Sequence, residues 1–250
     1  MCIRKLLIKN SEKFHLVSFD IENLFTSIPL EETIKICLLK LFQQNGSVMG
    51  LTKELFGKLL DHAVMNSFFI FSGKFYKQVE GLGMGLPLGP TFANIFMCHH
   101  EENLIRDCPT GFKPVLYQRY IDDTFLLFKE KSHAGLFLNY LNDKHSSIKF
   151  TAEHETENSL AFLDILIKRV DNYFTTSVYR KPTFSGLCIS FFSHCCYRFK
   201  INAIKTVIHR AYDICSNHSL LHRELELKKQ MFHNNRFYKN KIDSIQSIPT

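Results

Sequence analysis

Two aspartates, Asp122 and Asp123, stand side by side between two apolar segments of the chain. Val115-Leu116-Tyr117 precedes them and Phe125-Leu126-Leu127-Phe128 follows. This pattern predicts a strand, a tight turn and a second strand, with both carboxylates at the tip of the hairpin. Two like charges held together cost free energy unless a cation or a basic partner neutralises them. A plain polar turn is the simpler interpretation of the pair alone, because Asp tolerates turn geometry.

A third aspartate, Asp20, ends a separate apolar segment, Phe14-His15-Leu16-Val17-Ser18-Phe19, far upstream. Carboxylates delivered from the ends of buried strands suit hard, oxygen-preferring ions such as Mg²⁺. Two such ions roughly 3.5–4 Å apart can hold the attacking and leaving oxygens of an in-line phosphoryl displacement. The three aspartates together therefore favour a nucleotidyl-transfer enzyme that uses two Mg²⁺ ions, with Mn²⁺ as the alternative metal.

The bulk composition is that of a globular protein, with 45% hydrophobic and 22% charged residues in 250. No apolar run approaches the roughly 18–20 residues of a membrane span. The first eight residues are too soon interrupted by charge for a signal peptide. We therefore expect a soluble intracellular protein without a membrane partner.

Eight cysteines are present, and none of them forms a C-x-x-C pair. Their spacing fits no disulfide framework, so free thiols in a reducing compartment are expected. Some cysteines and histidines near the C-terminal part could be read as a zinc site, but they lie in segments with helical periodicity, which disfavours that interpretation. These residues are His194, Cys195, Cys196, Cys215, His218 and His222.

The net charge of +7 is unevenly distributed. Residues 1–179 carry 19 Lys and Arg against 20 Asp and Glu, whereas residues 180–250 carry 12 against 4. A basic C-terminal part beside a neutral body is typical of a protein that binds a phosphate backbone. A solvated basic helical face is the structural alternative.

Residues 81–90 read Gly-Leu-Gly-Met-Gly-Leu-Pro-Leu-Gly-Pro and cannot form regular structure. Pro90 fits the first turn of a helix that continues through Thr91-Phe92-Ala93-Asn94-Ile95-Phe96-Met97. Glycines allow a backbone to approach a ligand closely, as a loop beneath a template base and an incoming nucleotide would require. A plain turn remains the alternative, and the loop lacks the Gly-Lys-Ser/Thr ending of a P-loop.

The remaining periodicity gives a coarse element order of βαα, hairpin, α, ββ, α, βββ and then helices. Helices are expected from Leu30, over residues 51–66 and 133–145, and from Phe199 onward, with a hairpin at 68–79 around Ser72-Gly73-Lys74. Three further strands are predicted at residues 148–153, 160–169 and 173–179.

The order of these motifs resembles the palm of reverse transcriptases. A strand ends in Asp with an aromatic residue five positions later, a Gly/Pro loop enters a helix, and Y-x-D-D lies on a hairpin. Within that class, several phrases resemble Penelope-like retroelements, and the resemblance runs from about Phe14 to the mid-230s. The phrases are Ser18 to Pro29, Phe150-Thr151-Ala152-Glu153, Phe162-Leu163-Asp164 and Val178-Tyr179-Arg180-Lys181-Pro182-Thr183.

The resemblance implies an α+β fold: a right-hand polymerase palm, with an antiparallel sheet backed by helices, followed by a helical thumb. Residues 1–179 would form a partial palm, and residues 180–250 a basic primer-grip and thumb region. The fingers and the GIY-YIG endonuclease of such elements would lie outside this chain, as parts of a parent polyprotein. A nuclear location is also implied.

The family's site residues carry over position by position. Asp20, Asp122 and Asp123 match the catalytic carboxylates, and the carbonyl of Ile21 would complete the metal ligands. For the nucleotide, Phe25 matches the steric gate against a ribose 2′-OH, Met84 and Gly85 match the loop at the nascent base pair, and Lys149 matches a basic residue near the pyrophosphate. Many members have Gln at the position of Met84, and its hydrogen bond is absent here. Nucleic-acid contacts are expected from Arg180, Lys181, Arg198, Lys200, Lys205 and Arg210.

The implied reaction is RNA-directed DNA polymerisation, in which a primer 3′-OH attacks the α-phosphate of a deoxynucleoside triphosphate. Its partners would be an RNA template, a DNA primer and dNTP. The second hypothesis is a catalytically inert remnant that binds nucleic acid through its basic helices. Both predict salt-sensitive binding, but only the enzyme predicts metal-dependent incorporation.

Overall fold

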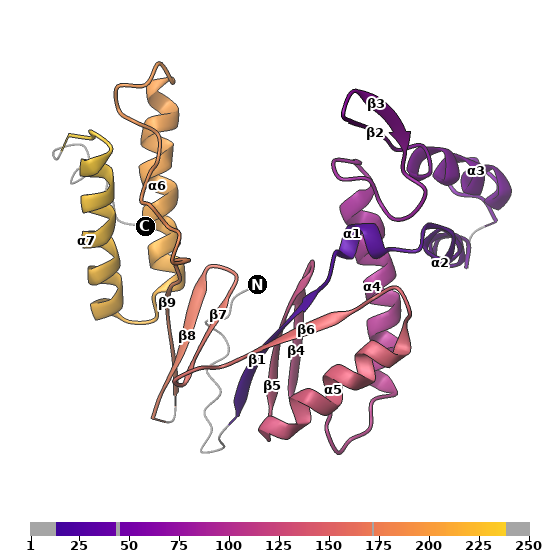
Figure 1. Ribbon diagram of the computed structural model, residues 1–250, viewed down its shortest axis with the longest axis horizontal. Coiled ribbons are helices and arrows are strands. Elements are labelled where there is room, and N and C mark those ends of the chain that lie inside the picture. The colour runs from indigo at the N-terminus through magenta and orange to yellow at the C-terminus, as the bar shows by residue number, and fades with distance from the viewer. Residues whose placement is uncertain (1–13, 44–45, 172, 239–250) are drawn as a thin grey trace. The chain divides into compact units, whose positions relative to one another are not determined.

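The computed structural model describes residues 14–43, 46–171 and 173–238, and these fall into two compact units. The first unit spans residues 14–154, and the second begins at Glu155 (Figure 1). No described helix is both long and apolar enough to cross a bilayer.

The first unit is built on a four-stranded antiparallel sheet with the strand order β4-β5-β1-β6. Strand β1 (His15–Ile21) is central, between β5 (Asp123–Phe128) and β6 (Phe150–His154), and β4 (Leu116–Tyr120) is at the edge. The β4–β5 hairpin predicted around the paired aspartates is therefore confirmed, and β1 is the strand predicted upstream of Asp20.

Two helices, α4 (Gly89–Arg106) and α5 (Lys131–Lys144), pack against the sheet in one core. Alternate residues of a strand point to the same face, and Val17, Phe19 and Ile21 of β1 all belong to this core. Phe137 of α5 is fully buried, with its ring 6.2 Å from Phe19 and 5.8 Å from Phe128. Because its neighbours Phe19 and Ile21 are packed in this core, the backbone of Asp20 has a fixed position at the end of β1.

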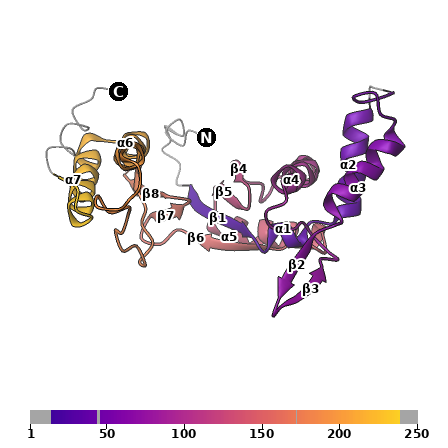
Figure 2. The same cartoon turned by 90° about the horizontal axis from the view of Figure 1, so that it is seen from above.

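Between β1 and α4 the chain forms α1 (Leu24–Ser27), α2 (Leu30–Phe42), α3 (Lys53–Val64) and the hairpin β2–β3 (Phe68–Phe71 and Lys74–Lys77). The hairpin is a two-stranded sheet of its own (Figure 2). All eight of its strand residues are exposed. The predicted helices and hairpin are confirmed here, while the single turn α1 was not foreseen.

The second unit contains a three-stranded antiparallel sheet, β7 (Ser159–Phe162), β8 (Ile165–Val170) and β9 (Tyr173–Val178), followed by α6 (Tyr197–Ile214) and α7 (His218–Asn234). Its helical core gathers around Ile204, Ile208, Phe232 and Phe237. Residues 181–196 contain neither helix nor strand.

One strand prediction was wrong. Residues 160–169 form two paired strands rather than one, because the chain reverses at Leu163 and Asp164. Leu163 has φ +56°, which permits a two-residue turn between Phe162 and Ile165. Apolar residues on both sides of Asp164 made the segment resemble one strand, since both strands bury residues.

Candidate active site

Backbone pairing brings the three predicted carboxylates to the same end of the sheet. Asp20 of β1 is directly opposite Asp123 of β5 in the antiparallel register. Asp122 belongs to the two-residue turn just before β5, and its carbonyl accepts a 3.1 Å hydrogen bond from the N–H of Ile21. Residues separated by about a hundred positions in the chain thus become neighbours through one strand pair.

The carboxylates also influence one another electrostatically. The sheet partly desolvates the Asp20 carboxylate and raises its pKa, and the negative charges of Asp122 and Glu22 raise it further. The backbone N–H of Ile21 acts in the opposite direction. Asp20 nevertheless remains exposed to solvent. A concentration of like charges that is open to solvent is suited to a divalent cation, because bound positive charge removes the repulsion.

A partly buried polar network connects the β4–β5 hairpin to helix α4. Arg119 of β4 donates through Nε to Glu101 of α4 at 2.5 Å, and the two side chains are only 7% and 14% exposed. Tyr117 donates to the same carboxylate at 2.7 Å, and Asn94 accepts from Arg119 Nη2 at 3.1 Å. Burial lowers the pKa of Arg119, but the hydrogen bond and charge of Glu101 outweigh it, so the net pKa lies above its usual value.

None of these network residues was predicted from the sequence. The one available signal was an arginine inside a predicted strand, because a guanidinium that is buried there requires a partner.

The glycine-rich loop lies against α1, which carries Phe25. The N–H of Leu82 donates to the carbonyl of Phe25 at 2.7 Å. A Cβ at Gly81, whose φ is +70°, would lie 2.3 Å from the carbonyl oxygen of Thr26, so only glycine fits there. The close approach at Gly81 is to the chain's own backbone, and the approach of this loop to a nucleotide stays a prediction.

The two nucleotide-site residues of this loop face solvent. Met84 is 87% exposed, and Gly85 is exposed with φ +90°. Phe25 is half-buried and packs against the core of the first unit.

The backbone of Lys149 is bonded to the segment that follows Asp20: its carbonyl accepts a 2.9 Å hydrogen bond from the N–H of Glu22. Its ammonium group donates to the carbonyl of Asn142 at 2.8 Å. The side chain is exposed, so this single bond holds it at the end of α5 without burying the charge.

The six cations predicted to contact nucleic acid differ in their surroundings. Lys181, Arg198 and Lys205 are exposed. Arg180 pairs with Glu224, and Arg210 pairs with Asp164. Lys200 is buried and donates to the carbonyls of Phe191 and Ser193 at 2.6 and 2.7 Å, so its charge is used within the fold.

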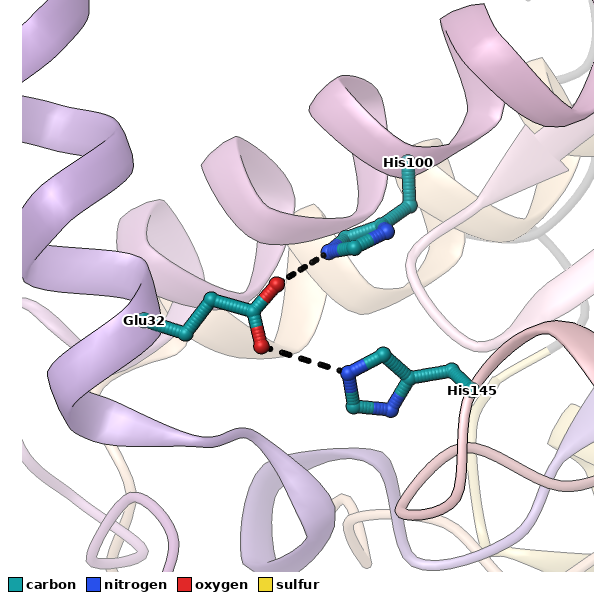
Figure 3. Close-up of side chains that lie close together, drawn as sticks. All are labelled: Glu32, His100 and His145. Atoms are coloured by element: carbon teal, nitrogen blue, oxygen red, sulfur yellow. Dashed lines mark hydrogen bonds and ion pairs between the residues drawn. The ribbon is translucent and has the colours of Figure 1, made fainter.

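A second group of potential metal ligands in the first unit contains none of the three aspartates (Figure 3). Glu32 of α2 is between His100 of α4, at 2.9 Å, and His145, at 3.3 Å. The backbone N–H of Ser147 donates to Nδ1 of His145, so in the neutral ring the proton is on Nε2, which faces Glu32. A metal on Nε2 would have to displace that proton, and the bonding therefore favours a carboxylate that accepts from two imidazoles.

This cluster contains none of the residues considered for zinc in the C-terminal part of the sequence. The seven cysteines among the described residues are free thiols, as predicted, and Cys2 lies outside the described residues.

The chain belongs to the reverse transcriptase family. The family model described as "Reverse transcriptase (RNA-dependent DNA polymerase)" matches residues 2–155, more than half of the sequence. It covers β1, the glycine-rich loop and the aspartate hairpin. A second model, described as an animal helix-turn-helix domain, matches residues 187–247, which include α6 and α7. The chain is thus an RNA-directed DNA polymerase by family.

Solved polymerase structures share the fold. A telomerase from Candida albicans, in complex with a fragment of telomeric RNA, has a TM-score of 0.65 at 12% identity, over 96% of this chain and 45% of that one. The RNA-dependent RNA polymerase 3Dpol of a sicinivirus gives 0.52 at 12% identity, over 92% and 50%. An apo telomerase from Candida tropicalis gives 0.54 at 12% identity, over 95% and 42%.

These likenesses confirm the predicted α+β fold of a right-hand polymerase, with an antiparallel sheet backed by helices. The chain spans half or less of the length of each of these structures. No curated protein sequence matches it significantly.

Proposed function

We propose that this chain is the palm and thumb of a reverse transcriptase from a Penelope-like retroelement, and that it extends a DNA primer on an RNA template with dNTP. The observation that carries the proposal is the register of Asp20 against Asp123, with Asp122 in the adjoining turn. The paired strands hold these carboxylates together, and their mutual repulsion favours cation binding.

Asp20, Asp122 and Asp123, with the carbonyl of Ile21, would hold two divalent ions, Mg²⁺ or Mn²⁺. All four donors are oxygens, which fits such hard cations. When bound, the ions lower the pKa of the primer 3′-OH and stabilise the charge that develops on the pyrophosphate. The chain's own part is to position those oxygens, since β1 and the β4–β5 hairpin are fixed by the core beneath them.

Other residues would orient the nucleotide and the duplex. Phe25 would exclude a ribose 2′-OH, Met84 and Gly85 would contact the nascent base pair, and Lys149 would attract the triphosphate. In the second unit the exposed Lys181, Arg198 and Lys205 are the best placed to contact phosphates. We propose residues 1–179 as palm and 180–250 as primer grip and thumb, with fingers and endonuclease segments of a parent polyprotein as partners in the nucleus.

The test is primer extension on poly(rA)/oligo(dT) with Mg²⁺ or Mn²⁺. Asp122→Asn should reduce extension at least about a thousandfold, because metal ions supply several kcal/mol of transition-state stabilisation. Asp107→Asn is the matched control, since Asp107 is an exposed aspartate at the end of α4 that pairs with Arg106. Full extension by Asp122→Asn would refute the two-metal assignment.

The competing hypothesis is an inert nucleic-acid-binding remnant, which the basic composition of residues 180–250 equally supports. It predicts no incorporation by the wild-type chain and salt-sensitive retention of the same template-primer. Adding an upstream fingers segment to the chain then separates a truncated enzyme, which would regain extension, from an inert remnant.

A further inference from the structure

The turn that carries Asp122 has an unfavourable backbone at its first residue. Ile121 adopts φ +58°, as a two-residue hairpin turn requires, but Gly, Asn or Asp normally occupies that position. For a β-branched side chain this conformation is an outlier. Such a residue persists where the surrounding structure determines its conformation, so the contacts of this turn must fix it.

Both peptide carbonyls of the turn have defined partners. Asp122 O accepts from the N–H of Ile21 on β1, the strand that also carries Asp20. Ile121 O accepts from Arg119 Nη1 at 2.9 Å. One bond therefore ties the turn to the opposite carboxylate strand, and the other ties it to a side chain of β4.

Arg119 is itself held rigidly by helix α4. Glu101 and Asn94 bind its Nε and Nη2, so three different nitrogens of one guanidinium have three different acceptors. Glu101 neutralises the charge of the guanidinium. Arg119 therefore acts on the turn through the direction of its hydrogen bond to Ile121 O and not through its charge. Lys cannot reproduce this arrangement, because it has one donor atom and lacks the planar fork.

We propose that Arg119, fixed by Glu101 and Asn94, is a positioning residue that holds the Ile121 turn and thereby sets the placement of Asp122 and Asp123 for metal binding. The inference rests on the proposed function of the aspartates. It assigns a role in the site to helix α4 that is distinct from core packing.

The test measures Mn²⁺ binding by EPR on the chain with template-primer, beside primer extension. Arg119→Lys should weaken Mn²⁺ binding by about tenfold or more, while the Kd for template-primer stays unchanged. Arg106→Lys is the matched control: the same substitution on an exposed arginine of α4, which pairs with Asp107. It should bind Mn²⁺ like the wild type.

A rescue variant separates positioning from a general loss of structure. Glycine takes φ > 0 without the Cβ penalty, so Ile121→Gly combined with Arg119→Lys should restore much of the Mn²⁺ affinity. Asn94→Ala removes only one hydrogen bond from Arg119. If Arg119→Lys fails to fold, this variant provides a milder perturbation of the same guanidinium.

Unchanged Mn²⁺ binding in the folded Arg119→Lys chain, or a loss that Ile121→Gly does not repair, would overturn the positioning role. Asp122→Asn in the same assay tests the metal site itself, so that a failure of the proposed function can be distinguished from a failure of the positioning role. If that variant binds Mn²⁺ as well as the wild type, the metal site itself is refuted, and the positioning role with it.

Discussion

The two hairpins of the first unit have turns of equal length in opposite surroundings. In β2–β3 the turn is Ser72-Gly73, with φ +49° and +74°, a combination that suits a two-residue hairpin without outside help. Its strands are exposed on both faces. In β4–β5 the turn residue Ile121 is unfavourable, yet Thr124 to Phe128 of β5 are all buried.

The two hairpins differ in what determines their conformation. The turn of the β2–β3 hairpin is favoured by its local sequence. A two-stranded hairpin with no further packing is only marginally stable in water. The β4–β5 hairpin contradicts its local preference at Ile121 and is held by the core and by Arg119. A strained turn supported in this way is typical of a functional site, whereas a relaxed turn is typical of a connection.

The largest expected effect compares one phenylalanine from each hairpin. Phe128→Ala in β5 removes a fully buried ring and should lower the free energy of unfolding by about 3–5 kcal/mol. Phe75→Ala in β3, where the ring is 78% exposed, should change it by less than about 0.5 kcal/mol. Urea unfolding followed by circular dichroism measures both, and equal losses would remove the distinction between the hairpins.

A smaller effect is expected from exchanging the turn preferences. Ile121→Gly should stabilise the first unit by about 1 kcal/mol, because relief of the Cβ clash exceeds the entropy cost of glycine. Gly73→Ala should destabilise β2–β3 by about 1–2 kcal/mol, since φ is +74° there. Hydrogen exchange of the amides in each hairpin reports the two changes separately. A destabilised Ile121→Gly turn would mean that Ile121 is not strained.

The smallest effect is the pH dependence of stability that comes from His100 of α4. Burial lowers the pKa of His100, and the neighbouring His145 and His99 act in the same direction, while Glu32 opposes them. The unfolded chain then binds more protons than the folded one between the lowered pKa and about 6.5, so stability is full above pH 6.5 and falls as the pH drops below it. Thermal melts from pH 7.5 to 5 should show this fall for the wild type.

His100→Gln is the variant that tests the assignment, because it removes the titrating group and should flatten the part of the slope due to His100. His62→Gln, on the exposed side of α3, is the control and should keep the wild-type slope. An unchanged slope in His100→Gln would assign the acid sensitivity to other groups.

Much of the fold was predictable because its signals are local. The apolar segment before Asp20 and the helical spacing after Leu30 predicted β1 and α2, and the Gly/Pro loop predicted a break before α4. The turn at Leu163 and Asp164 was missed because a single Asp between apolar residues is a weak turn signal, and Leu is unusual at φ +56°. Lys200 was predicted at the nucleic-acid surface because a sequence does not tell a buried lysine from an exposed one.

By itself, the sequence determined the three aspartates, the strand and the hairpin that carry them, and the family to which the chain belongs. Only the tertiary structure decided that Asp20 is opposite Asp123 and that Arg119 is buried against Glu101, 18 residues away on a different element. Periodicity and turn preference act over a few neighbouring residues. An ion pair that holds a strained turn requires a helix and a strand to pack first, and the formed core alone provides that arrangement.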